Sequence, residues 1–244
     1  MEPRFVDCHS HVVPSGDDGA KTPADGLELC DLAHDAGTAI LFGTPHVWPH
    51  LPLTETRERE VRQIYDRLRA RARLELRLGF ELTPAPALLR DDPARYVLEG
   101  TEVVLVEMPF PGPASDLIEL AEHVERAGLT PLVAHPERTD PVLERPELAA
   151  ELAERWPLQV NASSLTGRHG AAIEQLAWRL VEAGDVSVVA SDGHRPSRPA
   201  RVDEAYELVR ARVGEERALP LFDGSALGVS FGRPTPSREA AQGV

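Results

Sequence analysis

The sequence has few cysteines, and this excludes two kinds of protein. Cys8 and Cys30 are the only cysteines among 244 residues, which excludes a disulfide framework and fits a reducing cytoplasm. Neither cysteine is followed by the glycine-rich loop and arginine with which a cysteine-based phosphatase lowers the pKa of its thiol. We therefore expect a cytoplasmic protein that uses no cysteine nucleophile.

Positive charge and long apolar runs are also lacking. The 26 Lys and Arg residues are outnumbered by 40 Asp and Glu, for a net charge of −14, which argues against nucleic acid or a membrane surface as a partner. Clustered acidic groups are instead what hard divalent cations bind. No stretch of about 18 apolar residues and no charged start before an apolar run occurs, so neither membrane insertion nor a signal peptide is indicated.

What the sequence does contain is a regular alternation of short apolar runs and helical segments. The runs are residues 4–11, 38–44, 74–81, 102–108, 129–135, 158–161 and 186–192. The helical segments between and after them are 23–37, 54–72, a short proline-bounded helix after residue 81, 114–128, 146–156, 170–184 and 201–213. This alternation predicts an α/β domain of seven parallel strands with helices outside. We expect one domain over residues 1–232 and a disordered polar tail over 233–244.

The residues at the ends of the predicted strands decide between an open sheet and a closed barrel. These residues are His9, His11, His46, Glu81, Glu107, His135, Asn161, Asp192 and His194. In a parallel barrel all carboxyl ends of strands meet at one rim, whereas an open sheet spreads them along a line. Each predicted strand ends in a side chain of the kind that binds metals. Such a set can form one site only if the strand ends converge, so a barrel is the better interpretation.

The first strand explains how such a site begins. Residues i and i+2 of a strand project to the same face, so His9 and His11 are expected to point together into the rim. Asp7 lies one step deeper and is expected to accept a hydrogen bond from these ligands, while Cys8 is expected to face the helix layer. The glycine-flanked turn at Asp17 and Asp18 brings a carboxylate over the rim. Half of a metal site is thus predicted from one segment.

The motifs "DCHSH…DDGA", "TPH", "GFEL", "VEMPF", "AHPER", "QVN" and "SDGHRPSRP" resemble those of the polymerase-and-histidinol-phosphatase (PHP) superfamily. They are most similar to its bacterial manganese-dependent tyrosine-protein phosphatases of capsule and exopolysaccharide operons. The resemblance runs from about Asp7 to about Arg201, with the motifs in the family's order. It implies a distorted, TIM-like (β/α)7 barrel that carries three divalent metal ions at its rim.

The resemblance also implies which residues hold each ion. The first ion would be held by His9, His11, Glu81 and Asp192, the second by Glu81, Glu107 and His135, and the third by Asp18, His46 and His194. Manganese is the family's usual ion, and iron or zinc would also suit mixed nitrogen and oxygen ligands. Such ions lower the pKa of a bound water from 15.7 towards about 7, which implies in-line attack of a hydroxide on the phosphate.

Arginines complete the implied site, because a planar guanidinium binds phosphate through two parallel hydrogen bonds. Arg138 matches the family arginine that binds the substrate phosphate. Arg198 matches a second one, but its spacing from His194 is one residue shorter than in the family, so Arg195 or Arg201 could take that role. Asn161 is expected to contribute an orienting donor to the substrate side.

Several residues near these motifs have simpler explanations. His34, His50, His123 and His169 are assigned to helix surfaces or loops, and Asp17 to shaping its turn. Trp48 either walls the substrate pocket by stacking on an aromatic leaving group or packs its own loop.

Three functions remain open. The leading one is a protein-tyrosine phosphatase whose partner is a phosphotyrosyl protein, such as a bacterial tyrosine kinase. The second is a phosphatase of histidinol phosphate or another small phosphoester. The third is a metal-binding module without catalysis, against which the complete ligand set argues. A compact chain favours an open rim that accepts a protein segment, and the oligomeric state is left open.

Overall fold

Seven interrupted or continuous strands form the centre of the computed structural model, which describes residues 4–229. They are β1 (Phe5–Asp7), β2 (Thr38–Gly43) with β3 (His46–Val47), β4 (Glu75–Leu78) with β5 (Glu81–Leu82), β6 (Val103–Glu107), β7 (Thr130–Ala134), β8 (Leu158–Asn161) and β9 (Val188–Ala190). Each of the pairs β2/β3 and β4/β5 is one strand with a two-residue break, and β3 lies just beyond the predicted run 38–44. All seven predicted strands are therefore present.

The strands pair in parallel throughout and close on themselves. The pairing orders are β1-β2-β4 and β3-β5-β6-β7-β8-β9, and the Gly79 amide, which donates to the Gly43 carbonyl at 2.9 Å, continues the ladder from one set to the other. The last strand meets the first where the Asp192 amide donates to the His9 carbonyl at 2.9 Å. The result is a (β/α)7 barrel, distorted by the two breaks and by a register shift between Phe5 and Val6.

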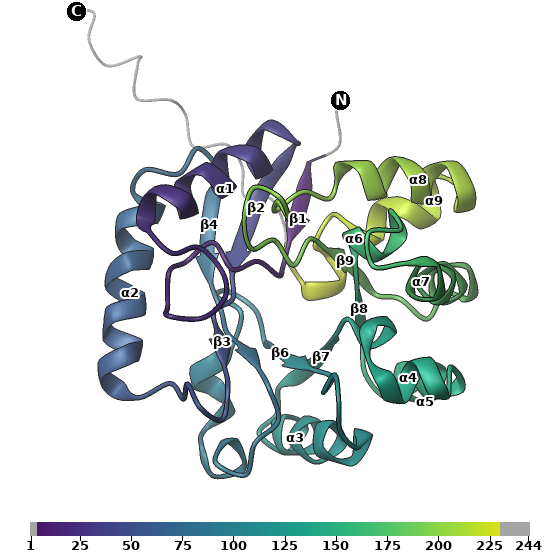
Figure 1. Ribbon diagram of the computed structural model, residues 1–244, viewed down its shortest axis with the longest axis horizontal. Coiled ribbons are helices and arrows are strands. Elements are labelled where there is room, and N and C mark those ends of the chain that lie inside the picture. The colour runs from purple at the N-terminus through teal and green to yellow at the C-terminus, as the bar shows by residue number, and fades with distance from the viewer. Residues whose placement is uncertain (1–3, 230–244) are drawn as a thin grey trace, which may run out of the picture.

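Helices surround this barrel, as Figure 1 shows. They are α1 (Pro23–Asp35), α2 (Glu55–Arg69), α3 (Ala114–Arg126), α4 (Asp140–Glu144), α5 (Glu147–Ala153), α6 (Ala162–Leu165), α7 (Ala171–Ala183), α8 (Asp203–Val213) and α9 (Glu215–Ala218). Thr22 and Asp25 form a capping box at the start of α1, and Thr54 Oγ1 caps α2 by accepting the Arg57 amide. Such caps satisfy amides that a first helical turn leaves unpaired. In the described range, no helix is both long and apolar enough to cross a membrane.

One predicted helix is replaced by shorter turns. Between β5 and β6 the chain forms two 3-10 helices, η1 (Leu88–Arg90) and η2 (Pro93–Tyr96), in place of the expected short helix. The prolines of this segment remove amide donors and restrict the preceding residues, so a continuous α-helix is not favoured. The predicted domain end at residue 232 and the tail 233–244 lie outside the described residues and stay predictions.

The core consists of two hydrophobic clusters, and successive residues of β6 contribute to them in turn. Val104 and Val106 pack in a large cluster with helix residues such as Leu117, whereas Val103 and Leu105 pack in a second cluster inside the barrel. Cys8 belongs to the inner cluster, so its predicted orientation towards the helix layer is wrong. Val6 lies in the same inner cluster, so the two-residue alternation of β1 places Cys8 on the inner face, and it breaks only after Cys8, where His9 also reaches the rim.

Candidate functional site

Histidines and carboxylates from separate strands converge at the carboxyl rim of the barrel. Four groups each bring three ligand atoms within 4.8 Å of one another. They are His9–His11–Asp192, His9–Glu81–His135, His46–Glu81–Glu107 and His11–His46–His194, and every member is buried. Asp18 lies at the edge of this cluster, with Oδ1 3.2 Å from His194 Nε2. The structure thus brings together the nine residues that the sequence analysis assigned to metal binding.

Glu81 lies at the centre of the cluster and is fully buried. Its Oε2 atom is 3.1 Å from His9 Nε2, 3.3 Å from His11 Nε2 and 2.9 Å from His46 Nδ1. Despite these short separations, Glu81 Oε2 and His46 Nδ1 make no hydrogen bond of acceptable geometry. Because buried polar atoms are normally paired, such contacts are typical of ligands arranged around a cation and not around one another.

Asp192 divides its two oxygens between the histidines and the arginines. Oδ1 is 3.3 Å from both His11 Nε2 and His194 Nδ1, whereas Oδ2 accepts hydrogen bonds from Arg138, Arg198 and Asn161. Asp192 and His135 have left-handed backbones, with φ of 51° and 37°. This backbone conformation is energetically unfavourable for a residue other than glycine. Both residues adopt it just after a strand, where their side chains enter the cluster.

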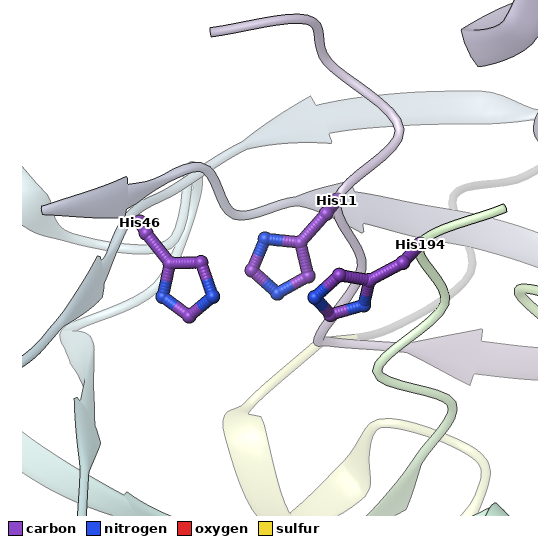
Figure 2. Close-up of side chains that lie close together, drawn as sticks. All are labelled: His11, His46 and His194. Atoms are coloured by element: carbon purple, nitrogen blue, oxygen red, sulfur yellow. The ribbon is translucent and has the colours of Figure 1, made fainter. Parts of the chain in front are cut away.

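His11, His46 and His194 lie side by side, each on a different segment (Figure 2). The His11 ring centroid is 4.0 Å from that of His194 and 4.3 Å from that of His46.

Asp17 accepts the amides of Gly19 and His46 at 3.2 and 3.1 Å, so it shapes its turn as expected and also fixes the backbone of His46. A Cβ on Gly19 would lie 2.4 Å from the His11 carbonyl oxygen, so only glycine allows this close approach.

The electrostatics of the cluster favour added positive charge. Burial lowers the pKa of His11, but Asp17, Asp192 and Glu81 outweigh this effect and hold that pKa well above its ordinary value. Burial, and then the negative charge of Glu81, raises the pKa of Glu107 to about 8. His11 and Glu107 therefore tend to keep their protons, because neighbouring carboxylates place negative charge close to them. Divalent cations would compensate the same negative charge. Burial also lowers the pKa of His135 to about 4, which keeps it in the neutral form that binds metals.

Gln159, which the sequence analysis missed, orients His9. Its Nε2 donates to Asn161 Oδ1 at 2.8 Å, so its Oε1 atom, 2.9 Å from His9 Nδ1, is the acceptor of the His9 ring proton. The lone pair of His9 then lies on Nε2 and faces the cluster. This role was predicted for Asp7, and that prediction is wrong, because Asp7 accepts the backbone amides of Ser191 and His9. Gln159 lies two residues before Asn161, on the same strand face, and this spacing was the available signal.

A pocket of about 340 Å³ lies over the cluster and receives two arginines. Arg138 and Arg198 both line it, and the Arg138 guanidinium lies 5.0 Å from the centre of the Phe110 ring. Arg195 is exposed, and Arg201 pairs with Asp203 at 2.6 Å. Of the three arginines left open for the second position, only Arg198 reaches this pocket, because a tight turn bonds the Arg198 amide to the Arg195 carbonyl.

Trp48 lines the pocket and contacts two histidines. Its ring stacks on His46 at 4.3 Å and on His50 at 5.1 Å between ring centroids. Trp48 therefore packs its own loop and also forms part of the pocket wall, and its stacking on an aromatic leaving group stays a prediction. His34, His123 and His169 lie outside the cluster and bind Asp35, the Asp91 carbonyl and Ser163, respectively.

Three further hydrogen bonds were not predicted. The Thr83 hydroxyl donates to Glu107 Oε2. Glu137 is fully buried and accepts from the Asn161 amide at 3.0 Å and the Ser164 hydroxyl at 2.6 Å. The latter contacts join the loop that carries Arg138 to the end of β8. The motif "HPER" contained Glu137, but nothing local in the sequence indicates where its side chain points.

The chain is similar to known proteins in both sequence and fold. The tyrosine-protein phosphatase YwqE of Bacillus subtilis is 29% identical over 236 residues, which are 91% of each chain. The tyrosine-protein phosphatase CpsB of Streptococcus agalactiae is 28% identical over 233 residues, covering 89% of this chain and 95% of that protein. A chain from the crystal structures of YwqE and of CpsB from Streptococcus pneumoniae, described as metal-dependent tyrosine phosphatases, matches with a TM-score of 0.79, 28% identity and coverage of 89% and 91%.

The family comparison covers nearly the whole described range. The model for capsular polysaccharide synthesis proteins of the CpsB/CapC type matches residues 5–227, which includes every strand of the barrel and every residue of the cluster. The chain therefore belongs to the CpsB/CapC family.

Proposed function

We propose that the chain is a metal-dependent phosphatase that hydrolyses phosphotyrosine in proteins. The main support for this proposal is that a buried histidine–carboxylate cluster and two arginines line the same pocket. The tyrosine-protein phosphatases to which the chain is similar support the same activity. The free, buried cysteines Cys8 and Cys30 fit the cytoplasmic location that we propose with it.

The cluster fits a group of divalent ions, since it combines imidazoles, carboxylates and buried atoms without hydrogen-bond partners. We assign His9, His11, Glu81 and Asp192 to one ion, Glu81, Glu107 and His135 to a second, and Asp18, His46 and His194 to a third. Mixed nitrogen and oxygen ligands suit manganese, with iron or zinc as alternatives. Such ions supply Lewis acidity that activates water and neutralises phosphoryl oxygens.

The arginines would position the phosphate. Asp192 Oδ2 accepts from both Arg138 and Arg198, so one carboxylate holds two guanidinium groups beside each other at the pocket. Their remaining N–H groups suit the oxygens of a phosphate monoester. Asn161 is fully buried and donates to the same Asp192 oxygen at 2.7 Å. We therefore assign it to orienting Asp192 and not to direct contact with substrate.

A side-by-side assay tests the substrate class. With manganese present, we expect a phosphotyrosyl peptide to be hydrolysed with a higher kcat/KM than histidinol phosphate, because the similar proteins are tyrosine-protein phosphatases and Trp48 and Phe110 give the pocket aromatic walls. The measurement is phosphate release at equal enzyme concentration. A strong preference for histidinol phosphate would contradict the proposed substrate while leaving the metal chemistry intact.

Gln159→Leu tests the hydrogen bond that orients His9. Loss of the acceptor frees the His9 ring to adopt the other tautomer, so we expect metal affinity to fall about 10-fold to 100-fold. The measurement is a manganese titration followed by calorimetry. Gln63→Leu, on the exposed face of α2, is the matched control. Unchanged affinity in Gln159→Leu would show that His9 is oriented without this bond.

A further inference from the structure

A second cleft, of about 250 Å³, lies beside the candidate pocket. Most of its lining is apolar and comes from β3, η1 and the segments that follow β3 and β5, namely Val47, Pro49, Pro52, Leu53, Ala85 and Leu88. Trp48 lines both this side cleft and the pocket. The two hollows therefore share one side chain as a wall.

The strand pair β3–β5 explains why the hollows are adjacent. His46 pairs with Glu81 and Val47 with Leu82, and neighbouring strand residues project to opposite sides. His46 accordingly lines the pocket, whereas Val47 lines the side cleft. Trp48 stacks on the rings of His46 and His50, and these contacts hold the wall in position. Thr54 and Glu55, at the start of α2, complete the lining of the cleft.

The polar groups of the side cleft are already paired. Arg95 donates to Glu58 at 2.8 Å and to the Leu53 carbonyl at 3.1 Å, and Asp91 accepts the Tyr96 hydroxyl at 2.6 Å. Glu55 adds an exposed carboxylate to the rim. Among the residues that line this cleft, the guanidinium is thus engaged and the remaining rim charge is negative. A second phosphate or an acidic side chain is disfavoured, and an apolar side chain is favoured.

We infer that the side cleft binds an apolar side chain, such as leucine or phenylalanine, that lies within three residues of the phosphotyrosine in a protein substrate. This inference rests on the proposed phosphatase function. It identifies a feature of the protein substrate that residues beside the candidate pocket would recognise. Because one side chain separates the hollows, a short extended segment is long enough to enter both. Apolar burial then adds to the binding energy without touching the reacting groups.

Peptide kinetics test the inference. The substrates are phosphotyrosyl peptides with a glycine–serine background and one leucine placed at each position from three before to three after the phosphotyrosine. We expect leucine at one or two of these positions to raise kcat/KM about tenfold over the all-glycine–serine peptide. Aspartate at the same position should give no increase. p-Nitrophenyl phosphate, which fills only the pocket, serves as the reference substrate.

Variants locate the preference in the cleft. Ala85→Trp fills the cleft, and Ala87→Trp does so from a more exposed position, which keeps the test valid if the first variant fails to fold. Both should remove the tenfold leucine preference while leaving hydrolysis of p-nitrophenyl phosphate within about twofold of the parent protein. Ala24→Trp, exposed on α1, should retain the preference.

The outcomes separate this inference from the proposed function. Equal kcat/KM for all peptides, a preference for aspartate, or a leucine preference that survives both cleft variants would overturn the inference while p-nitrophenyl phosphate is still hydrolysed. A change of oligomeric state in both cleft variants, without a change in peptide preference, would overturn it in favour of an interface between copies. No hydrolysis of any substrate by the parent protein would contradict the proposed function itself.

Discussion

Glu81→Gln is expected to remove bound metal and to lower kcat for p-nitrophenyl phosphate by about 10³-fold or more. The oxygens of Glu81 lie within 3.3 Å of nitrogens from His9, His11, His46 and His135. Glutamine keeps the volume of the side chain but removes the charge that two proposed ions would share. It also places an amide donor among imidazole nitrogens that need their lone pairs for metal.

The measurements for this variant are metal content by mass spectrometry and the rate of phosphate release. Glu99→Gln is the matched control, because Glu99 is a partly buried carboxylate that accepts from Tyr65 and from the Leu78 amide, away from the cluster. It should retain metal and activity. A Glu81→Gln protein that is folded, keeps its full metal content and turns over normally would show that Glu81 is not a ligand.

Arg138→Ala is expected to lower kcat/KM for a phosphotyrosyl peptide by about 10²-fold to 10³-fold while metal content stays unchanged. The guanidinium lies over the Phe110 ring and donates to Asp192 at 2.8 Å, which fixes its plane at the pocket. Arg138→Lys should recover only part of the loss, since lysine keeps the charge beside Asp192 but not the paired hydrogen bonds.

Steady-state kinetics and metal analysis check this prediction together. Arg195→Ala is the matched control, because Arg195 is exposed on the same loop as Arg198; it should behave as the parent protein. Loss of metal from both Arg138→Ala and Arg138→Lys would mean that Arg138 supports Asp192 structurally and that its assignment to phosphate is wrong.

The fold could be predicted from the sequence because it depends on patterns that are local. Continuous apolar runs such as 102–108 and the intervening helical segments require only alternation to be recognised. The breaks between β2 and β3 and between β4 and β5 could not be predicted, since they depend on how the strands bend around a closed barrel. The segment 84–96 was misassigned because its prolines were taken as bounds of a helix, whereas they prevent one.

The site was predictable as a set of residue types at strand ends, and less so as a set of contacts. His46 and Glu107 needed only their position after an apolar run to be singled out. The acceptor behind His9 was assigned to the nearest carboxylate in sequence, Asp7, whereas Gln159 reaches it from β8, a strand distant in sequence. The left-handed backbones of His135 and Asp192 are likewise imposed by tertiary contacts, which no local pattern contains.

The central claim is that residues distant in sequence bind a shared group of divalent ions at one rim, and anomalous diffraction from crystals grown with manganese tests it most directly. We expect more than one anomalous peak in contact with Glu81 and Asp192, with His135 and His194 on opposite sides of the group. A fully folded protein with no peak among these side chains, or with manganese bound only elsewhere, would contradict the account.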